Sequence, residues 1–189
     1  GSPWQKVAVD FFGPLPRSPN GNRYIMVVID YYSKWVECYP VANIDATTIV
    51  RTFVKEIISR YGIPLEVHSD QGRGFESRLV EEMFRRFGIM KTRATPYRPQ
   101  SDGLVERFMR TSKSQLAKLT EGVQTEWEES IPWLTLYYRG TEQASTGYSP
   151  ARLFVERELL LPMDLKFGRP RNSTESSSFE SSNMRRDRK

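Results

Sequence analysis

Residues 68–77 read HSDQGRGFES, and the apolar segment 65–69 that leads into them predicts a short β-strand. This strand should end at Asp70, because a Gln-Gly turn signal follows. Residues 4–12, WQKVAVDFF, predict an earlier strand of alternating apolar residues, closed by a Gly-Pro pair. Asp10 lies inside it. An aspartate is therefore expected in, or at the end of, each of two apolar strands.

Turn signals and apolar periodicity predict the elements on either side of these segments. The predicted strands are residues 4–12, 24–30, 34–40, 65–69 and 89–94. The predicted helices are residues 45–61, 76–87, 101–119, 127–138 and 151–156. The first three strands predict an antiparallel meander, and the later strands, joined by helices, predict parallel pairing. We therefore expect an α/β fold with a mixed five-stranded sheet flanked by helices.

Length and composition predict one globular domain with a short appendage. Hydrophobic residues make up 38% of the 189 residues, which is enough for a buried core, and we assign this core to residues 1–168. Residues 169–189 are rich in Ser and Arg and are predicted to be a disordered tail. No apolar run approaches the roughly 20 residues that a membrane-spanning helix needs, so no membrane partner is expected.

The residue types also restrict the cofactors. The chain has one cysteine, Cys38, and one histidine, His68, which excludes an internal disulfide and a four-ligand zinc site. A metal here would be a hard cation bound by oxygen, such as magnesium or manganese. The net charge of +5 permits binding to a polyanion without requiring it.

Three acidic residues are candidate metal ligands: Asp10 and Asp70 on predicted strands, and Glu106 on a predicted helix. Two-metal phosphodiester chemistry needs several carboxylates around ions roughly 3.5–4 Å apart. Each residue also has a simpler interpretation. Asp10 could accept backbone donors at a strand end, Asp70 could form an Asx turn, and Glu106 could pair with Arg110 one helical turn later. The motif context favours the catalytic interpretation.

That context is a family resemblance. Thirty-five residues separate Asp70 from Glu106, and residues 95–107 read TPYRPQSDGLVER. Other matching stretches are residues 4–14, 28–35, 145–150 and 161–165. Together this text resembles the integrase catalytic core of retroviruses and, most closely, that of Ty3/Gypsy-type long-terminal-repeat retrotransposons. The resemblance covers roughly residues 3–168.

The resemblance implies an RNase H-like fold in which Asp10, Asp70 and Glu106 bind two magnesium or manganese ions. It implies a metal-dependent integrase that trims the 3′ ends of element DNA and transfers them into target DNA. It also implies a homodimer or higher homo-oligomer in the nucleus, with a cytoplasmic or virus-like-particle stage. A fourth carboxylate, Asp30, closes a predicted strand and is interpreted as structural.

Two alternative functions stay open. A host gene captured from a transposon would keep the fold as a DNA-binding or protein-interaction module with little or no catalysis. The intact acidic triad argues against this alternative, and metal titration tests it. An RNase H-type nuclease would share the metal chemistry but would cut RNA in an RNA–DNA hybrid.

Residues near Glu106 are candidate DNA contacts. Arg110 and Lys113 share its helical face and would meet a phosphate there, whereas Phe108 belongs to the opposite, core-facing stripe. A solvated amphipathic helix is the simpler interpretation. In the family, the loop before this helix helps to hold the DNA end, and its candidates here are Tyr97, Arg98 and Gln100. A turn-rich linker is the plainer alternative for this loop.

The chain departs from the usual family text at three positions. Arg98 replaces a customary His, Met109 a customary Asn and Glu156 a customary Gly, and none of these changes removes a metal ligand. Three tryptophans are predicted to be core residues: Trp35, Trp127 and Trp133. The alternative location for them is the subunit contact through which the family's cores dimerise.

Overall fold

The computed structural model describes residues 1–93, residue 108 and residues 126–167. The chain divides into two compact units, Gly1–Leu159 and Leu160–Lys189. The sequence-based boundary at residue 168 stays a prediction, and the tail assigned to residues 169–189 lies outside the described residues. Of the predicted helix 101–119, only Phe108 is described, and it is helical.

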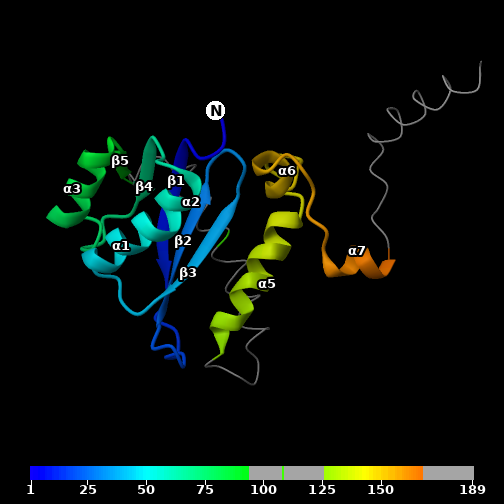
Figure 1. The fold of residues 1–189 in the computed structure, drawn as a ribbon, viewed down its shortest axis with the longest axis horizontal. Helices are drawn as coiled ribbons and strands as arrows, with labels where there is room; N and C mark the ends of the chain where they lie inside the picture. The colour runs from blue at the N-terminus through cyan, green and yellow to red at the C-terminus, as the bar shows by residue number, and fades with distance from the viewer. Residues whose placement is uncertain (94–107, 109–125, 168–189) are drawn as a thin grey trace, which may run out of the picture. The chain divides into compact units, whose positions relative to one another are not determined.

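The first unit is built around a five-stranded sheet (Figure 1). The strands stand in the order β3-β2-β1-β4-β5. Their bounds are β1 (Lys6–Phe12), β2 (Tyr24–Asp30), β3 (Val36–Val41), β4 (Glu66–Ser69) and β5 (Met90–Arg93). β2 pairs antiparallel with β1 and β3, and β4 pairs parallel with β1 and β5. The predicted meander, the parallel strands and the mixed five-stranded sheet are therefore confirmed.

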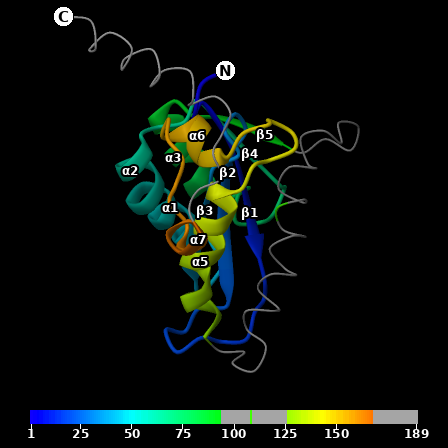
Figure 2. The same cartoon turned by 90° about the vertical axis from the view of Figure 1, so that its right-hand side faces the viewer.

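Side chains of β1 alternate between two hydrophobic cores, as the pleat of a strand requires. Val7 and Val9 belong to the core under α1 (Ala46–Thr52) and α3 (Arg78–Phe87), whereas Ala8 belongs to the core under α5 (Trp127–Gly140). Figures 1 and 2 show α1 and α3 on one face of the sheet and α5 on the other. Asp10, two residues after Ala8, therefore lies on the α5 face.

The helix predicted after Asp45 is confirmed, with a π-helical turn that the sequence did not predict. The Asp45 carboxylate accepts the Thr48 N–H (2.8 Å) as an N-cap. α1 continues directly into the π-helix η1 (Phe53–Ile58) and then into α2 (Ser59–Tyr61). The spacing of four residues still predicts the buried side chains, which are Ile49, Phe53 and Ile57.

Two helices are shorter than predicted, and each begins directly after a serine N-cap. Ser77 caps α3, which therefore begins two residues later than expected, and Gly88 ends it in the left-handed conformation (φ 66°). Ser149 caps α6 (Pro150–Phe154), which ends before Glu156.

Three further differences are local. β1 begins at Lys6 rather than at residue 4, because Trp4 has φ 66° and its N–H donates to Asp30. β3 begins at Val36, so Trp35 precedes the strand. The second unit contains a short helix, α7 (Pro162–Phe167), that was not predicted. Within the described ranges, no helix is long and apolar enough to cross a bilayer.

Candidate active site at the ends of two parallel strands

Asp10, near the carboxyl end of β1, and Asp70, directly after β4, lie side by side just beyond the end of the β1–β4 ladder. These strands are parallel, and Val9 pairs with Ser69 at the end of their ladder. The next residue along each chain is an aspartate, Asp10 within β1 and Asp70 directly after β4. Backbones of adjacent strands are about 4.8 Å apart, so the two residues are neighbours. Two of the three predicted metal ligands are therefore brought together.

A backbone N–H orients each carboxylate. The Phe11 N–H donates to Oδ1 of Asp10 (2.7 Å), which is half-buried. The Gly72 N–H donates to Oδ1 of Asp70 (3.0 Å), which is exposed. These are the strand-end and Asx-turn contacts of the simpler interpretations. A carboxylate has about four acceptor positions, so one such donor fixes its direction without preventing cation binding.

The turn after Asp70 leaves little room for a side chain at either of its two glycines. A Cβ on Gly72 would lie 2.9 Å from Oδ1 of Asp70, and a Cβ on Gly74 would lie 2.5 Å from the backbone oxygen of Ile44. Phe75 then anchors the turn in the core, where it is 2% exposed. The sequence contained the signal, two glycines within four residues of the aspartate, but the steric role of Gly74 emerges only from its packing against Ile44.

Lys91 is a supporting residue that sequence reasoning missed. Its ammonium donates to the backbone oxygen of Phe75 (2.7 Å) and to the carboxylate of Glu76 (2.6 Å). β5 thereby holds the far end of the turn that begins at Asp70. A lone lysine on a predicted strand gave no sign of this contact.

The third predicted ligand, Glu106, lies outside the described residues, as do the predicted DNA contacts Tyr97, Arg98, Gln100, Arg110 and Lys113. Phe108, two residues after Glu106, is 2% exposed and confirms the predicted core-facing position. Its ring meets that of Tyr138 edge to face at 4.7 Å, within the core that includes Ala8. The chain at Phe108 is thus packed on the face of the sheet that carries Asp10. Among the described residues, no group of three or more His, Cys, Asp or Glu side chains could hold a metal ion.

Asp30 is structural, as predicted. It is fully buried, and its carboxylate accepts hydrogen bonds from the backbone N–H groups of Trp4 (3.1 Å) and Ser33 (2.8 Å) and from the Ser33 hydroxyl (2.6 Å). These donors close the β2–β3 turn and fix the start of the chain, so Asp30 does not belong to the acidic site.

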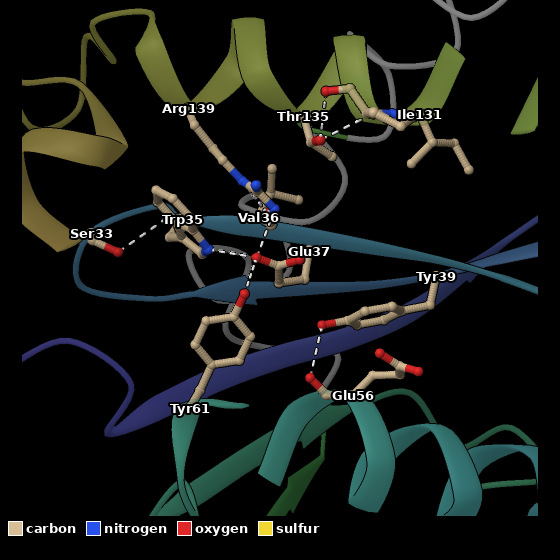
Figure 3. A network of polar contacts seen from close by, with 11 residues as sticks. Ser33, Trp35, Val36, Glu37, Tyr39, Glu56, Tyr61, Ile131, Thr135 and Arg139 are labelled. Atoms are coloured by element: carbon tan, nitrogen blue, oxygen red, sulfur yellow. Dashed lines mark hydrogen bonds and ion pairs between the residues drawn. The ribbon is translucent and has the colours of Figure 1, made fainter. Parts of the chain in front are cut away.

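A hollow of about 570 Å³ lies at the opposite edge of the sheet, along β3, and its lining includes neither Asp10 nor Asp70. Beside it, the buried Glu37 carboxylate accepts the Trp35 Nε1–H (2.8 Å), the Tyr61 hydroxyl (2.5 Å) and Arg139 (2.6 Å), as Figure 3 shows. Burial, with the hydrogen bond to Glu37, raises the pKa of Tyr61 to about 12. Burial likewise raises the pKa of the Cys38 thiol to about 12. Cys38 and Tyr39 both line the hollow, and burial raises the pKa of each, so both side chains stay protonated at neutral pH.

The prediction that three tryptophans are core residues is right for two of them. Trp35 and Trp127 are 7% and 2% exposed, whereas Trp133 is 54% exposed. Trp133 lies on the outer side of α5, because the inward side is taken by Trp127, Ile131, Leu134 and Thr135. Helical spacing thus separates Trp133 from the core, despite its apolar character.

The comparisons agree with this geometry. The "Integrase core domain" family model matches residues 2–99. The Gag-Pol polyprotein of Walleye dermal sarcoma virus is 34% identical over 158 residues, which is 83% of this chain and 9% of the polyprotein. The Pro-Pol polyprotein of Simian foamy virus type 3 (strain LK3) is 32% identical over 151 residues, 80% of this chain and 13% of its own length. The Retrovirus-related Pol polyprotein from transposon 412 of Drosophila melanogaster is 26% identical over 159 residues, which is 84% of this chain and 13% of the polyprotein.

Solved structures show the same architecture. The catalytic core domain of BIV integrase has a TM-score of 0.65 and 26% identity, covering 81% of this chain and 95% of that one. The HTLV-2 integrase catalytic core domain in complex with magnesium has a TM-score of 0.64 and 18% identity, covering 80% of this chain and 97% of that one. The fold is therefore the RNase H-like fold of these cores, as predicted. The chain spans 9 to 13% of the length of the three polyproteins described above.

Proposed function

This chain belongs to the integrase core domain family, and from this membership we propose that it is the catalytic core of a polynucleotidyl transferase. The proposed reactions are trimming of the 3′ ends of element DNA and transfer of those ends into target DNA. The observation that carries the proposal is the neighbouring position of Asp10 and Asp70 at the ends of two paired strands.

The donor set suits magnesium or manganese, because both cations prefer anionic oxygen ligands. We propose that Asp10, Asp70 and Glu106 hold two such ions. Support for Glu106 comes from Phe108, which lies two residues later and is buried on the face of Asp10. When bound, the ions would stabilise the charge on the attacking and leaving oxygens of a phosphodiester. The similar HTLV-2 core is described in complex with magnesium, which supports a divalent cation.

The protein's own contribution is to fix the carboxylates before DNA arrives. The Phe11 and Gly72 N–H groups set their directions, and the β1–β4 ladder sets their spacing. In the transfer step, a 3′ hydroxyl oxygen attacks phosphorus in the target strand. The bond from phosphorus to the 3′ oxygen of the target strand breaks, that oxygen takes up a proton from solvent, and the attacking hydroxyl releases its proton to solvent. Groups already in position reduce the reorganisation that this step requires.

DNA contacts are proposed for Tyr97, Arg98, Gln100, Arg110 and Lys113, on the basis of their nearness in sequence to Glu106. Phosphate contacts from Arg110 and Lys113 release counterions, so alanine at either position should weaken DNA binding and flatten its salt dependence. Binding that is unchanged at all salt concentrations would contradict this assignment.

We also propose self-association through the outer side of α5. Trp133 and Tyr137, one helical turn apart, are 54% and 42% exposed. Sedimentation should show a dimer or larger species for the wild type and a monomer for Trp133→Glu.

The source and the place of action are further proposals. The resemblance of the motifs supports a Ty3/Gypsy-type element as the source of the chain. The place of action is then the nucleus, where target DNA lies.

Strand joining with manganese and a pre-cleaved DNA end tests the proposed function. The wild-type chain should join ends, and Asp10→Asn, Asp70→Asn and Glu106→Gln should each abolish joining while the circular dichroism spectrum stays unchanged. Glu129→Gln, an exposed carboxylate on α5, is the matched control and should remain active. A wild-type chain that binds DNA but joins none would favour the captured-module alternative.

A further inference from the structure

The amino-terminal end of α5 is tied to the turn that follows β1. The Glu128 carboxylate accepts hydrogen bonds from the Ser18 hydroxyl, from Nδ2 of Asn20 (2.7 Å) and from Nδ2 of Asn22 (2.9 Å). Next to it, the Trp127 indole N–H donates to the backbone oxygen of Pro16 (2.8 Å). One helical turn therefore satisfies four polar groups of a segment more than a hundred residues away in the sequence.

The carboxyl-terminal end of α5 is tied to β3. The Arg139 guanidinium donates twice to the backbone oxygen of Val36 (2.8 and 2.6 Å) and pairs with the buried Glu37 (2.6 Å), as Figure 3 shows. It also lies over the Trp35 ring, 4.3 Å from its centroid. β3 is an edge strand, so this contact occupies a carbonyl that no neighbouring strand takes.

α5 needs these ties because its interior is weakened. Pro132 lies inside the helix and has no N–H to donate to the carbonyl one turn earlier. The Thr135 hydroxyl is turned back onto the Ile131 and Pro132 carbonyls (both 3.0 Å), which competes with regular helical bonding. The polar contacts at the two ends therefore add to the buried Trp127, Ile131 and Leu134 in fixing where the helix lies on the sheet.

Within the described part of the chain, an aromatic contact links α5 to Phe108. Tyr138, next to Arg139, meets the ring of Phe108 edge to face at 4.7 Å. Phe108 is 2% exposed and belongs to the same core as Ala8 of β1 and Trp127 of α5. By chain connectivity, Phe108 is two residues from Glu106.

We propose that α5 supports the catalytic centre. Glu128 and Arg139 are positioning residues that hold α5 in place and act through Tyr138 and Phe108. The inference rests on the proposed function, since its effect is on strand joining. Neither residue touches DNA or metal in this role. Loosening either end should let α5 shift on the sheet and reduce the fraction of molecules in which the carboxylates are aligned.

The test compares Glu128→Ala with Glu129→Ala, which removes the same charge from the same helical turn at an exposed position. Amide exchange of Gly21 and Asn22, whose N–H groups bond to Ser18, should rise about tenfold in Glu128→Ala, as expected for the loss of partly buried hydrogen bonds. The kcat for strand joining should fall by about the same factor with KM for DNA unchanged. Glu129→Ala should match the wild type in both measurements.

Glu128→Gln keeps a carbonyl oxygen that can accept from Ser18 and Asn22, so it should recover most of the kcat lost in Glu128→Ala. Asn20→Ala removes one of the three donors and provides a milder variant if Glu128→Ala does not fold. In Glu128→Ala, faster amide exchange with a kcat equal to that of Glu129→Ala would contradict the proposed role of α5. Unchanged amide exchange would contradict it as well. A wild-type chain that joins no DNA would instead contradict the proposed function, and the inference would fall with it.

Discussion

Alanine substitutions at Gly72 and Gly74 should separate the stability of the active-site turn from its chemistry. The Cβ of Gly74→Ala would lie 2.5 Å from the Ile44 backbone oxygen and 2.8 Å from Cδ1 of Ile49. Backbone cannot rotate away as a side chain can, so the turn and the segment before α1 must move apart. Such overpacking costs about 1–3 kcal/mol. For a chain of this size, that lowers Tm by roughly 2–12 °C.

Gly72→Ala presents the opposite case. Its Cβ would lie 2.9 Å from Oδ1 of Asp70, which is the end of a side chain and can rotate. Folding should therefore be nearly unaffected, but Asp70 must leave the direction that the Gly72 N–H gives it. Strand joining should then fall at least tenfold with little change in Tm, since each tenfold loss corresponds to about 1.4 kcal/mol of transition-state stabilisation.

Differential scanning calorimetry and the manganese-dependent joining assay, applied to both variants, distinguish the two effects. We expect a Tm lowered by roughly 2–12 °C for Gly74→Ala, and at least a tenfold loss of activity at near wild-type Tm for Gly72→Ala. A wild-type Tm for Gly74→Ala would refute the steric argument. Full activity in Gly72→Ala would refute the claim that the direction of the Asp70 carboxylate matters.

Three further predictions concern stability. Glu156→Gly should raise the free energy of unfolding by about 1 kcal/mol, because Glu156 has φ 59°, where residues with a Cβ are strained; an unchanged value in urea titration would contradict this. Three donated hydrogen bonds, outweighing burial, hold the pKa of Glu128 below its usual range. The wild type should therefore be more stable than Glu128→Gln above about pH 4.3, and this advantage should disappear as the pH falls further; an advantage that persists at pH 2 would be inconsistent. Arg139→Ala should cost about 3–5 kcal/mol, because Glu37 stays buried without its cation, and a loss below 1 kcal/mol in the same titration would exclude that role.

The sequence predicted most of the sheet and the adjacent positions of Asp10 and Asp70. Strand 24–30 was predictable to the residue, because all but its first side chain are buried and a strong turn signal precedes it. Asp10 and Asp70 were predictable as neighbours once both strands were recognised, since parallel strands bring their carboxyl ends to the same edge. The role of Asp30 followed from its position at the end of a strand.

Other features depend on contacts that are distant in the sequence. The π turn in η1 leaves the spacing of the buried residues intact, so periodicity alone did not predict it. Trp133 is apolar but lies outside the buried stripe of α5, whose orientation depends on Glu128 and Arg139. Lys91 meets the turn after Asp70 only because β5 pairs with β4.

The central claim is that Asp10 and Asp70 belong to one metal-binding site. Anomalous diffraction from crystals soaked in manganese, recorded with and without the Asp70→Asn substitution, tests it most directly. We predict manganese within coordination distance of both carboxylates in the wild type and its loss in the variant. Manganese that binds elsewhere, or that contacts one aspartate and not the other, would contradict the account.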